Sequence, residues 1–343
     1  MLSGSPKDDD RQAAQSVEIS RIPIVDFTGF LSGSTAERRR IADEIIAACE
    51  TIGFFYLTGH GVTETKRQAI FDRAEQFFHL PKEQKEQSTA TQEWNRGYIF
   101  GGSADRALDA NTRVFEQYRI QREFAPDDPD LKTDNPLFQP NRWPSQIDGF
   151  GKDCIAYYDA MSDLASELLQ AIAIGLDLPE DRFVRYFRKP VCQISLMYYP
   201  ALPGDAGNEV KNLSIHTDEG PVVILAQGKI GGLEVKTSDG RWLAAPPIPG
   251  AFTINIGNMM MWWSNGRLKS TLHRVRNTSG QERFSVPFFW NADPSVIVEP
   301  LPELVERDGV SRYKPVEVGP LLSRFYKSAV YTPPDTDNTV ATT

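Results

Sequence analysis

The sequence predicts an α+β protein with a double-stranded β-helix (jelly-roll) core and flanking helices packed on the sheet. The first half of the chain carries apolar residues at helical spacing, which indicates amphipathic helices. From residue 193 onward, short apolar segments are bounded by Gly, Pro, Asn or Asp, a pattern typical of strands joined by turns. No helical pattern separates these segments, and such a series of strands is typical of a sandwich or a jelly roll.

Three helices and two short strands are expected in the first part of the chain. One helix follows Thr63, a typical N-cap residue, and carries Phe77 and Phe78 on its apolar side. The longest helix ends near Gly175 and Pro179, which are stop signals, and we expect it to lie against the outside of the main sheet. The longest helix covers 151–175, and the remaining helix covers 35–50. The two strands cover 22–27 and 53–57.

Seven strands are expected after the long helix, and an irregular region is expected before it. Residues 88–143 contain many Gly and Pro residues, and long loops in compact domains often form the lid or rim of a functional site. The expected strands are 193–199, 222–227, 233–237, 251–256, 259–263, 272–276 and 283–290.

The chain is expected to form one structural unit in which four stretches differ in character. Residues 1–20 form a disordered leader, and residues 21–150 form an N-terminal α/β region with rim loops. Residues 151–330 form the helix and the jelly-roll core, and residues 332–343, rich in Thr, Pro and Asp, form a flexible tail.

Composition narrows the classes of function. A net charge of −9 and a pI near 5.1 argue against a nucleic-acid partner, because phosphate contacts require clustered Lys and Arg. No apolar run approaches the roughly 18 residues of a membrane span, and the polar leader lacks the apolar segment of a secretory signal. Three widely spaced cysteines favour a reducing compartment. We therefore expect a cytoplasmic protein with no membrane partner.

A candidate metal site consists of His216, Asp218 and His273. His216 and Asp218 are two positions apart, so both point to one side of a strand, and His273 completes the set if its strand returns beside the first. Two imidazoles and one carboxylate are the ligands of non-haem iron(II) oxygenases. His60 and His79 lie at the ends of other expected elements, and there we expect local hydrogen bonds instead of metal ligation.

A candidate carboxylate clamp lies ten positions beyond His273. Arg283 and Ser285 share one face of an expected strand, and a guanidinium with a hydroxyl suits a carboxylate. An outward-facing Arg283 in a surface ion pair is the alternative. Tyr199, at the end of another strand, would add a second hydroxyl to the clamp.

Six further residues are candidates for the substrate site. Arg96, Tyr98, Tyr118 and Arg119 fall in the irregular region and are expected at its entrance, with solvated loop residues as the alternative. Phe289 and Trp290 belong to a group of bulky apolar residues near the clamp, which favours an apolar or aromatic small molecule as the substrate.

These motifs, in their order and spacing, are similar to those of the iron(II) and 2-oxoglutarate dependent dioxygenases, isopenicillin N synthase-like branch. The resemblance extends over roughly residues 22–326 and has two departures, Met197 where the branch has Asn and Asn258 where it usually has Asp. It is carried by His216-Thr217-Asp218, by the run from Ser264 to Val275, by Arg283-Phe284-Ser285 and, nearer the N-terminus, by Ile22 to Phe27, Gly53 to Leu57, His60-Gly61-Val62 and Phe77 to Pro81.

The resemblance implies a set of roles and cofactors. His216, Asp218 and His273 would bind Fe(II), Arg283 and Ser285 would hold the distal carboxylate of 2-oxoglutarate, and Tyr199 would assist them. With O2 as cosubstrate, such an enzyme oxidises an unactivated C–H bond of a small molecule by hydroxylation, desaturation or ring chemistry, commonly in secondary metabolism.

Two alternatives remain at this point. An iron oxidase or cyclase of the same branch that uses no 2-oxoglutarate carries the same Arg-x-Ser motif. A ligand-binding barrel without catalysis would keep the fold. The sequence does not predict the substrate, the reaction outcome or the oligomeric state.

Overall fold

The structure is a computed structural model. It describes residues 22–91, 94–100, 115–132, 135, 137–201 and 213–329. The expected leader and tail lie outside these residues, and so does part of the expected rim region. The division of the chain into two large regions stays a prediction.

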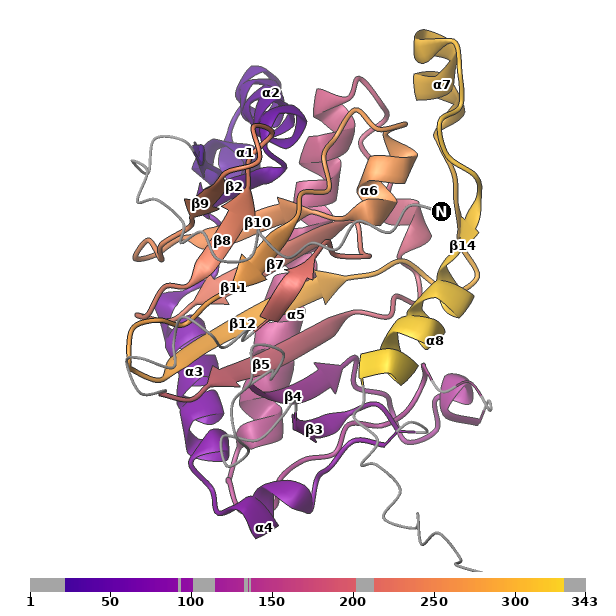
Figure 1. Ribbon diagram of the computed structural model, residues 1–343. Helices are drawn as coiled ribbons and strands as arrows, with labels where there is room; N and C mark the ends of the chain where they lie inside the picture. Colours follow the sequence, from indigo (N-terminus) through magenta and orange to yellow (C-terminus); the bar gives the residue numbers. More distant parts are fainter. Residues whose placement is uncertain are drawn as a thin grey trace, which may run out of the picture.

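A large mixed sheet forms the centre of the described part of the chain (Figure 1). Its eight strands follow the order β1-β2-β10-β7-β12-β5-β4-β3, and only the β1–β2 pair is parallel. Its strands are β1 (Ile24–Asp26), β2 (Phe54–Thr58), β3 (Gly97–Phe100), β4 (Glu116–Gln121), β5 (Gln193–Tyr199), β7 (Val222–Gln227), β10 (Phe252–Ile256) and β12 (Arg283–Trp290).

A smaller sheet lies across the interior face of the large one. Its order is β6-β11-β8-β9, and the two sheets together form the expected jelly roll. A second apolar cluster, which includes Phe54 and Tyr56 of β2 and Val235 and Leu243 of the small sheet, fills part of the space between the sheets. The strands are β6 (Leu213–His216), β8 (Leu233–Lys236), β9 (Trp242–Ala244) and β11 (His273–Val275), and a separate pair is β13 (Ile297–Val298) with β14 (Val316–Glu317).

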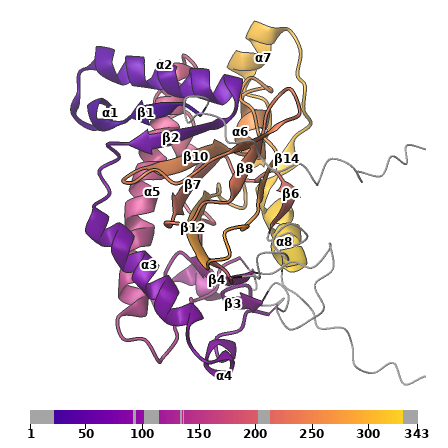
Figure 2. The same cartoon turned by 60° about the vertical axis from the view of Figure 1, so that its left-hand side comes forward.

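Helices α2 (Thr35–Thr51), α3 (Glu64–Phe78) and α5 (Phe150–Gly175) cover the opposite face of the large sheet (Figure 2). Side-chain caps begin two of them. Thr63 accepts from the Lys66 amide, as the sequence indicates, and Ser34 accepts from the Glu37 amide. The apolar faces of the three helices and the helix-facing residues of β5, β7, β10 and β12 belong to one core cluster.

The remaining helices are shorter and lie around the sheets. They are α1 (Thr28–Ser32), α4 (Lys82–Glu86), α6 (Asn258–Trp263), α7 (Pro302–Asp308) and α8 (Val318–Ala329), with 3-10 turns η2 (Pro129–Lys132) and η3 (Val184–Tyr186). Among all the described helices, none has the length and apolar character needed to cross a bilayer.

The expected helices and most expected strands are confirmed, with two corrections. Residues 259–263 were expected to form a strand, but they form helix α6, in which Met259, Met260 and Trp263 are buried. A short run of large apolar residues looks the same for a buried helix and a buried strand, so periodicity alone does not separate them. The region 88–143, expected to be irregular, contains β3 and β4, which extend the large sheet.

Phe77 tests the packing of the helical layer on the sheet. Its ring is fully buried and contacts Phe78, Tyr98, Tyr118 and Phe150. Replacing it with Ala should lower the free energy of unfolding by about 3–5 kcal/mol, because the substitution removes a buried ring and leaves a cavity. Chemical denaturation checks this value. Phe71→Ala, on the same helix but only partly buried, should cost clearly less, and equal losses would contradict the packing described here.

Candidate metal and cosubstrate site

Three metal-binding side chains converge where β6 ends and β11 begins. His216 and His273 are paired across these antiparallel strands, and their rings lie 4.2 Å apart. Asp218 follows two residues after His216, with its carboxylate oxygens 3.7 Å from His216 Nε2 and 3.5 Å from His273 Nε2. Each residue offers one ligand atom, and these three atoms all lie within 4.8 Å of one another. A single cation can therefore contact all three side chains.

Neighbouring groups orient two of these three residues. Asn255 on β10 donates from Nδ2 to Asp218 Oδ2 at 2.7 Å, and both residues are buried. His273 Nδ1 lies 3.1 Å from the Thr271 carbonyl. A proton on that nitrogen would be donated to the carbonyl, which leaves the lone pair of Nε2 facing the cluster. Phe54 packs edge-on against the His273 ring at 5.4 Å.

Gly257 allows the loop that carries Asp218 to lie against the N-terminus of α6. The amide of Asn258 donates to the Asp218 carbonyl at 2.7 Å, and that of Met259 donates to the Glu219 carbonyl at 3.1 Å. A Cβ atom at Gly257 would stand 2.0 Å from the Gly220 carbonyl oxygen. Any larger residue would displace the loop, so the position of Asp218 requires glycine at residue 257.

The candidate clamp faces the interior of the jelly roll. Arg283 pairs with Tyr199 across β12 and β5, its Nη1 donates to Ser285 Oγ at 3.0 Å, and its guanidinium lies 4.8 Å from the centre of the Tyr199 ring. Arg283 is only 1% exposed, which rules out the outward-facing alternative.

The charge of Arg283 has no acidic partner among the described residues. Its Nε is buried without a hydrogen bond there, and burial lowers the pKa of the guanidinium, an effect that the neighbouring Tyr199 opposes. Burial likewise raises the pKa of Tyr199, against the influence of Arg283 and Ser285. A buried guanidinium is costly without an anion, so this group of donors fits the carboxylate of a cosubstrate.

A cavity of about 410 Å³ extends from this group past the metal-binding cluster to helix α8. Tyr199, His216 and Asp218 line it, together with polar and apolar side chains from both sides. The other lining residues are Phe100, Phe115, Gln117, Arg119, Gln193, Ser195, Met197, Leu213, Thr217, Glu219, Gly220, Pro287, Phe289, Asn291, Leu322, Phe325 and Tyr326.

Of the two apolar residues expected at the substrate, only Phe289 lines this cavity. Trp290 is the next residue of β12 and therefore points to the opposite face. There it stacks on Phe187 at 5.2 Å and belongs to the core beneath the helices. The expectation for Trp290 is corrected by the strand alternation.

Three of the four polar residues expected at the entrance are also placed elsewhere, whereas the fourth, Arg119, lines the cavity. Arg96 is buried and donates to backbone carbonyls of Arg122 and Leu137. Tyr98 donates to Glu116, which also accepts from Lys85.

Tyr118 lies on the helix side of β4, where its ring meets Phe77 at 4.5 Å and its hydroxyl donates to the Arg142 carbonyl. Tyr118 therefore takes part in the core, and neither it nor Arg96 or Tyr98 lines the cavity.

Several cavity residues were missed by the sequence reasoning. Gln117, Gln193 and Ser195 occupy, with Arg119, alternate positions of β4 and β5, on the face opposite the apolar core. Polar residues at 193 and 195 alternate with apolar residues at 194 and 196, and this pattern could have identified the polar face of the strand. Asn255 was also missed, although a buried strand with an amide at one position suggests a polar partner nearby.

The other two histidines make local contacts, as expected. His60 accepts from the Val62 amide at 3.2 Å and lies 3.0 Å from the Gly250 carbonyl. His79 is exposed and lies 3.0 Å from Glu282.

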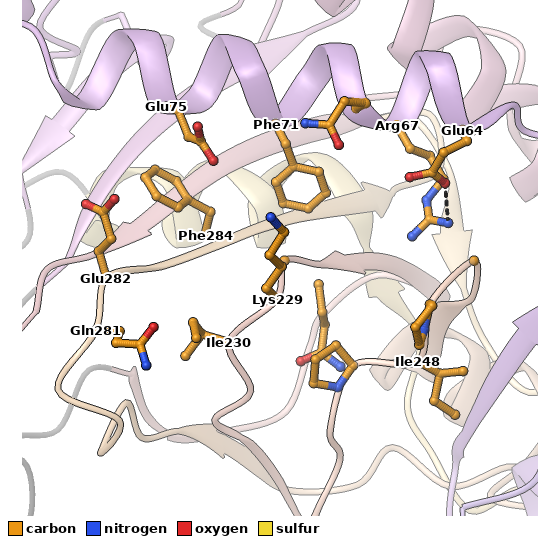
Figure 3. A pocket seen from close by; sticks show the side chains of 16 residues that line it. Glu64, Arg67, Phe71, Glu75, Lys229, Ile230, Ile248, Gln281, Glu282 and Phe284 are labelled. Carbon is orange, nitrogen blue, oxygen red and sulfur yellow. Dashed lines mark hydrogen bonds and ion pairs between the residues drawn. The ribbon is translucent and has the colours of Figure 1, made fainter.

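A larger cavity, of about 720 Å³, lies outside the jelly-roll interior, between α3 and the loops that follow β7 and β9 (Figure 3). Lys229 extends toward Phe71 there, and Arg67 pairs with Glu64. Among the described residues no histidine lines this cavity, and no member of the metal-binding cluster reaches it. The metal-binding residues His216 and Asp218 line the interior cavity and not this one.

Comparison with protein families matches two parts of the chain. Residues 22–146 match the family described as non-haem dioxygenase in morphine synthesis N-terminal, and residues 190–292 match the 2OG-Fe(II) oxygenase superfamily.

Individual relatives agree over nearly the whole chain. The 2-oxoglutarate-Fe(II) type oxidoreductase hxnY of Emericella nidulans is 31% identical over 313 residues, which is 90% of each protein. The 2-oxoglutarate-dependent dioxygenase thnC of Trichoderma harzianum is 33% identical and covers 79% of this chain and 85% of its own. The crystal structure of a full-length Neurospora crassa protein in complex with alpha-KG superposes with a TM-score of 0.81 at 28% identity, covering 90% of this chain and 96% of that one. The same Neurospora protein has been crystallised with alpha-KG and thymine.

Asn255 tests how the cluster is held. Replacing it with Ala removes the hydrogen bond to Asp218 and should weaken binding of a divalent cation about 10- to 100-fold, the usual cost of losing a partner that orients a metal ligand. Titration with Co(II), followed by its visible absorption, measures the affinity. Asn258→Ala is the matched control, because the Asn258 side chain donates to the neighbouring Glu219, and its backbone amide, which donates to the Asp218 carbonyl, is kept in the variant. Equal affinities of the Asn255 variant and the unmodified protein would contradict this role.

Proposed function

We propose that this chain, which belongs to the 2-oxoglutarate–Fe(II) oxygenase superfamily, binds Fe(II) through His216, Asp218 and His273. The chain is a 2-oxoglutarate-dependent dioxygenase, with Fe(II) and 2-oxoglutarate as cofactors. Its relatives carry 2-oxoglutarate in their names, which favours this enzyme class over an iron oxidase and over a barrel without catalysis. The observation that supports the ligand assignment is the convergence of two imidazoles and one carboxylate within 4.8 Å.

The distal carboxylate of 2-oxoglutarate is assigned to Arg283, Ser285 and Tyr199. The support is chemical, because these residues offer a buried cation and two hydroxyls, and the Arg283 Nε has no hydrogen bond among the described residues. The fork of a guanidinium matches a carboxylate in shape and charge. Met197, which takes the place of Asn in the related motif, faces the same cavity and contributes no hydrogen bond of that kind.

When bound, Fe(II) and 2-oxoglutarate supply oxidising power, since O2 and the 2-oxo acid yield succinate, CO2 and an oxidant for a C–H bond. The side chains of this chain need not act as acid or base in that reaction. His216, Asp218 and His273 hold the cation, Arg283 and Ser285 orient the cosubstrate, and the apolar wall near Phe289 excludes water from the reacting atoms.

The substrate is a small molecule, in line with the thymine bound by the Neurospora relative. A cavity of about 410 Å³ beside the metal-binding cluster is within the range that suits a compact organic molecule. The carbon that reacts would be one that this cavity places next to His216 and Asp218. The outcome assigned here is oxidation of an unactivated C–H bond, as hydroxylation, desaturation or ring chemistry, in a pathway of secondary metabolism.

Anaerobic titration tests this proposal. The unmodified protein with Fe(II) should develop a visible charge-transfer band when 2-oxoglutarate is added, and admission of O2 should release succinate. His216→Ala should lose the band and the succinate, because one of three protein ligands is gone. His79→Ala is the control, since that histidine is exposed, pairs with Glu282 and belongs neither to the cluster nor to the cavity lining, and it should behave like the unmodified protein. A His216 variant that retains full succinate release would refute the assignment.

A further inference from the structure

The interior cavity contains a second buried arginine, Arg119. It lies on β4 directly opposite Ser195 of β5, lines the cavity and is only 2% exposed. Its position follows from strand alternation, because Tyr118 and Ile120 on either side of it belong to the core under the helices.

The charge of Arg119 lacks an acidic partner among the described residues. Its one hydrogen bond there runs from Nη1 to the Asn95 carbonyl at 3.3 Å, and its guanidinium lies 5.1 Å from the centre of the Tyr326 ring. Nε is buried without a partner. Burial lowers the pKa of Arg119 to about 10, so the group is still a cation at neutral pH.

Neutral donors and acceptors surround this cation within the cavity. Gln117 and Gln193 both donate from Nε2 to Ser195 Oγ at 2.7 Å, which leaves the Ser195 hydroxyl proton available to another acceptor. Gln193 Oε1 is buried without a hydrogen bond among the described residues. The two acids that line the cavity, Asp218 and Glu219, belong to the loop that carries the metal-binding carboxylate. Neither forms an ion pair with Arg119 in the described part of the chain.

Arg119 and the Arg283 clamp lie at separate positions along β5, and of the clamp residues Tyr199 lines the cavity. Arg283 pairs with Tyr199, whereas Arg119 pairs with Ser195 of the same strand. Four residues of an extended strand span about 13 Å. Because of this spacing, a distal carboxylate of 2-oxoglutarate that is bound by Arg283 cannot also contact Arg119. A second anion is needed to neutralise the second cation.

We propose that Arg119 binds a carboxylate of the substrate, so that the substrate is a carboxylic acid with an apolar body. This inference rests on the proposed function, in which the cosubstrate is held by Arg283. The body of the acid lies against the aromatic wall formed by Phe115, Phe289 and Phe325, which line the same cavity. A single guanidinium flanked by neutral amides suits a monoanion, whereas a phosphate dianion usually gathers several cations or a helix N-terminus.

Matched pairs of acids and amides test the inference by binding. The full chain is loaded with Zn(II), which does not react with O2, and with saturating 2-oxoglutarate so that Arg283 is already engaged. The probes are 3-phenylpropanoate, 4-phenylbutanoate and octanoate, each compared with its primary amide, and ligand-observed NMR measures their affinities. The acids should bind at least tenfold more tightly than their amides.

Variants locate the binding group. Arg119→Gln should reduce the affinity for the acids at least tenfold and leave the amides unchanged, while Arg119→Lys should restore part of the affinity. Arg96→Gln is the matched control, because Arg96 is also buried, also without an acidic partner among the described residues, and stacked on Phe124, but does not line the cavity. The Arg96→Gln variant should bind the acids as the unmodified protein does, even if it loses as much stability as Arg119→Gln.

Several results would overturn the inference. They are equal binding of acids and amides, no binding of any acid, unchanged acid binding in Arg119→Gln, or loss of 2-oxoglutarate affinity in that variant, which would make Arg119 the cosubstrate clamp. Failure of the proposed function is seen separately, because the unmodified protein would then bind no 2-oxoglutarate in the same titration. If Arg119→Gln does not fold, the comparison of acids with amides on the unmodified protein still tests whether the site binds a carboxylate.

Discussion

The alternation of side chains along β12, β5 and β4 is the constraint on which the site depends. Each of these strands packs apolar residues against the helical layer, and its opposite face lines the jelly-roll interior with most of the polar residues of the site and a few apolar ones. On β12 this places Phe284, Val286 and Phe288 in the core and leaves Arg283 and Ser285 facing inward. A shift of one residue in register would reverse both faces at once, so the same packing that stabilises the protein also holds its polar groups in place.

Burial makes these polar groups effective. A guanidinium that is removed from water interacts strongly with any anion that reaches it, because water no longer competes. Arg283 and Arg119 are only 1% and 2% exposed, and Arg119, Tyr199, His216 and Asp218 line the same cavity. Two cations at separate positions along β5 would fix the orientation of both the cosubstrate and the substrate relative to the cluster. Gly257 and Asn255 hold Asp218 in place, Gly257 by allowing the close approach of its loop and Asn255 by a hydrogen bond to its carboxylate.

The sequence predicted those parts of the fold and site in which a local pattern and the tertiary structure agree. The pair His216 and Asp218, and the pair Arg283 and Ser285, could be recognised because two-residue spacing alone places them on one face. Trp290 was misplaced because its face depends on the register of the whole strand. Helix α6 was missed because a run of Met and Trp fits a buried helix and a buried strand equally well. Asn255 could not be assigned, and Arg119 could be placed only in the entrance region without a role, since both roles depend on strands that are distant in the sequence.

A crystal structure of the anaerobic complex with Fe(II) and 2-oxoglutarate would test the central claim, that the interior face places the metal, the cosubstrate and the substrate at separate points. We expect iron bound to one atom each of His216, Asp218 and His273. The distal carboxylate of 2-oxoglutarate should contact Arg283 and Ser285, and the Arg119 guanidinium should remain open to the cavity. A distal carboxylate on Arg119, or iron bound without one of the three residues, would contradict the account.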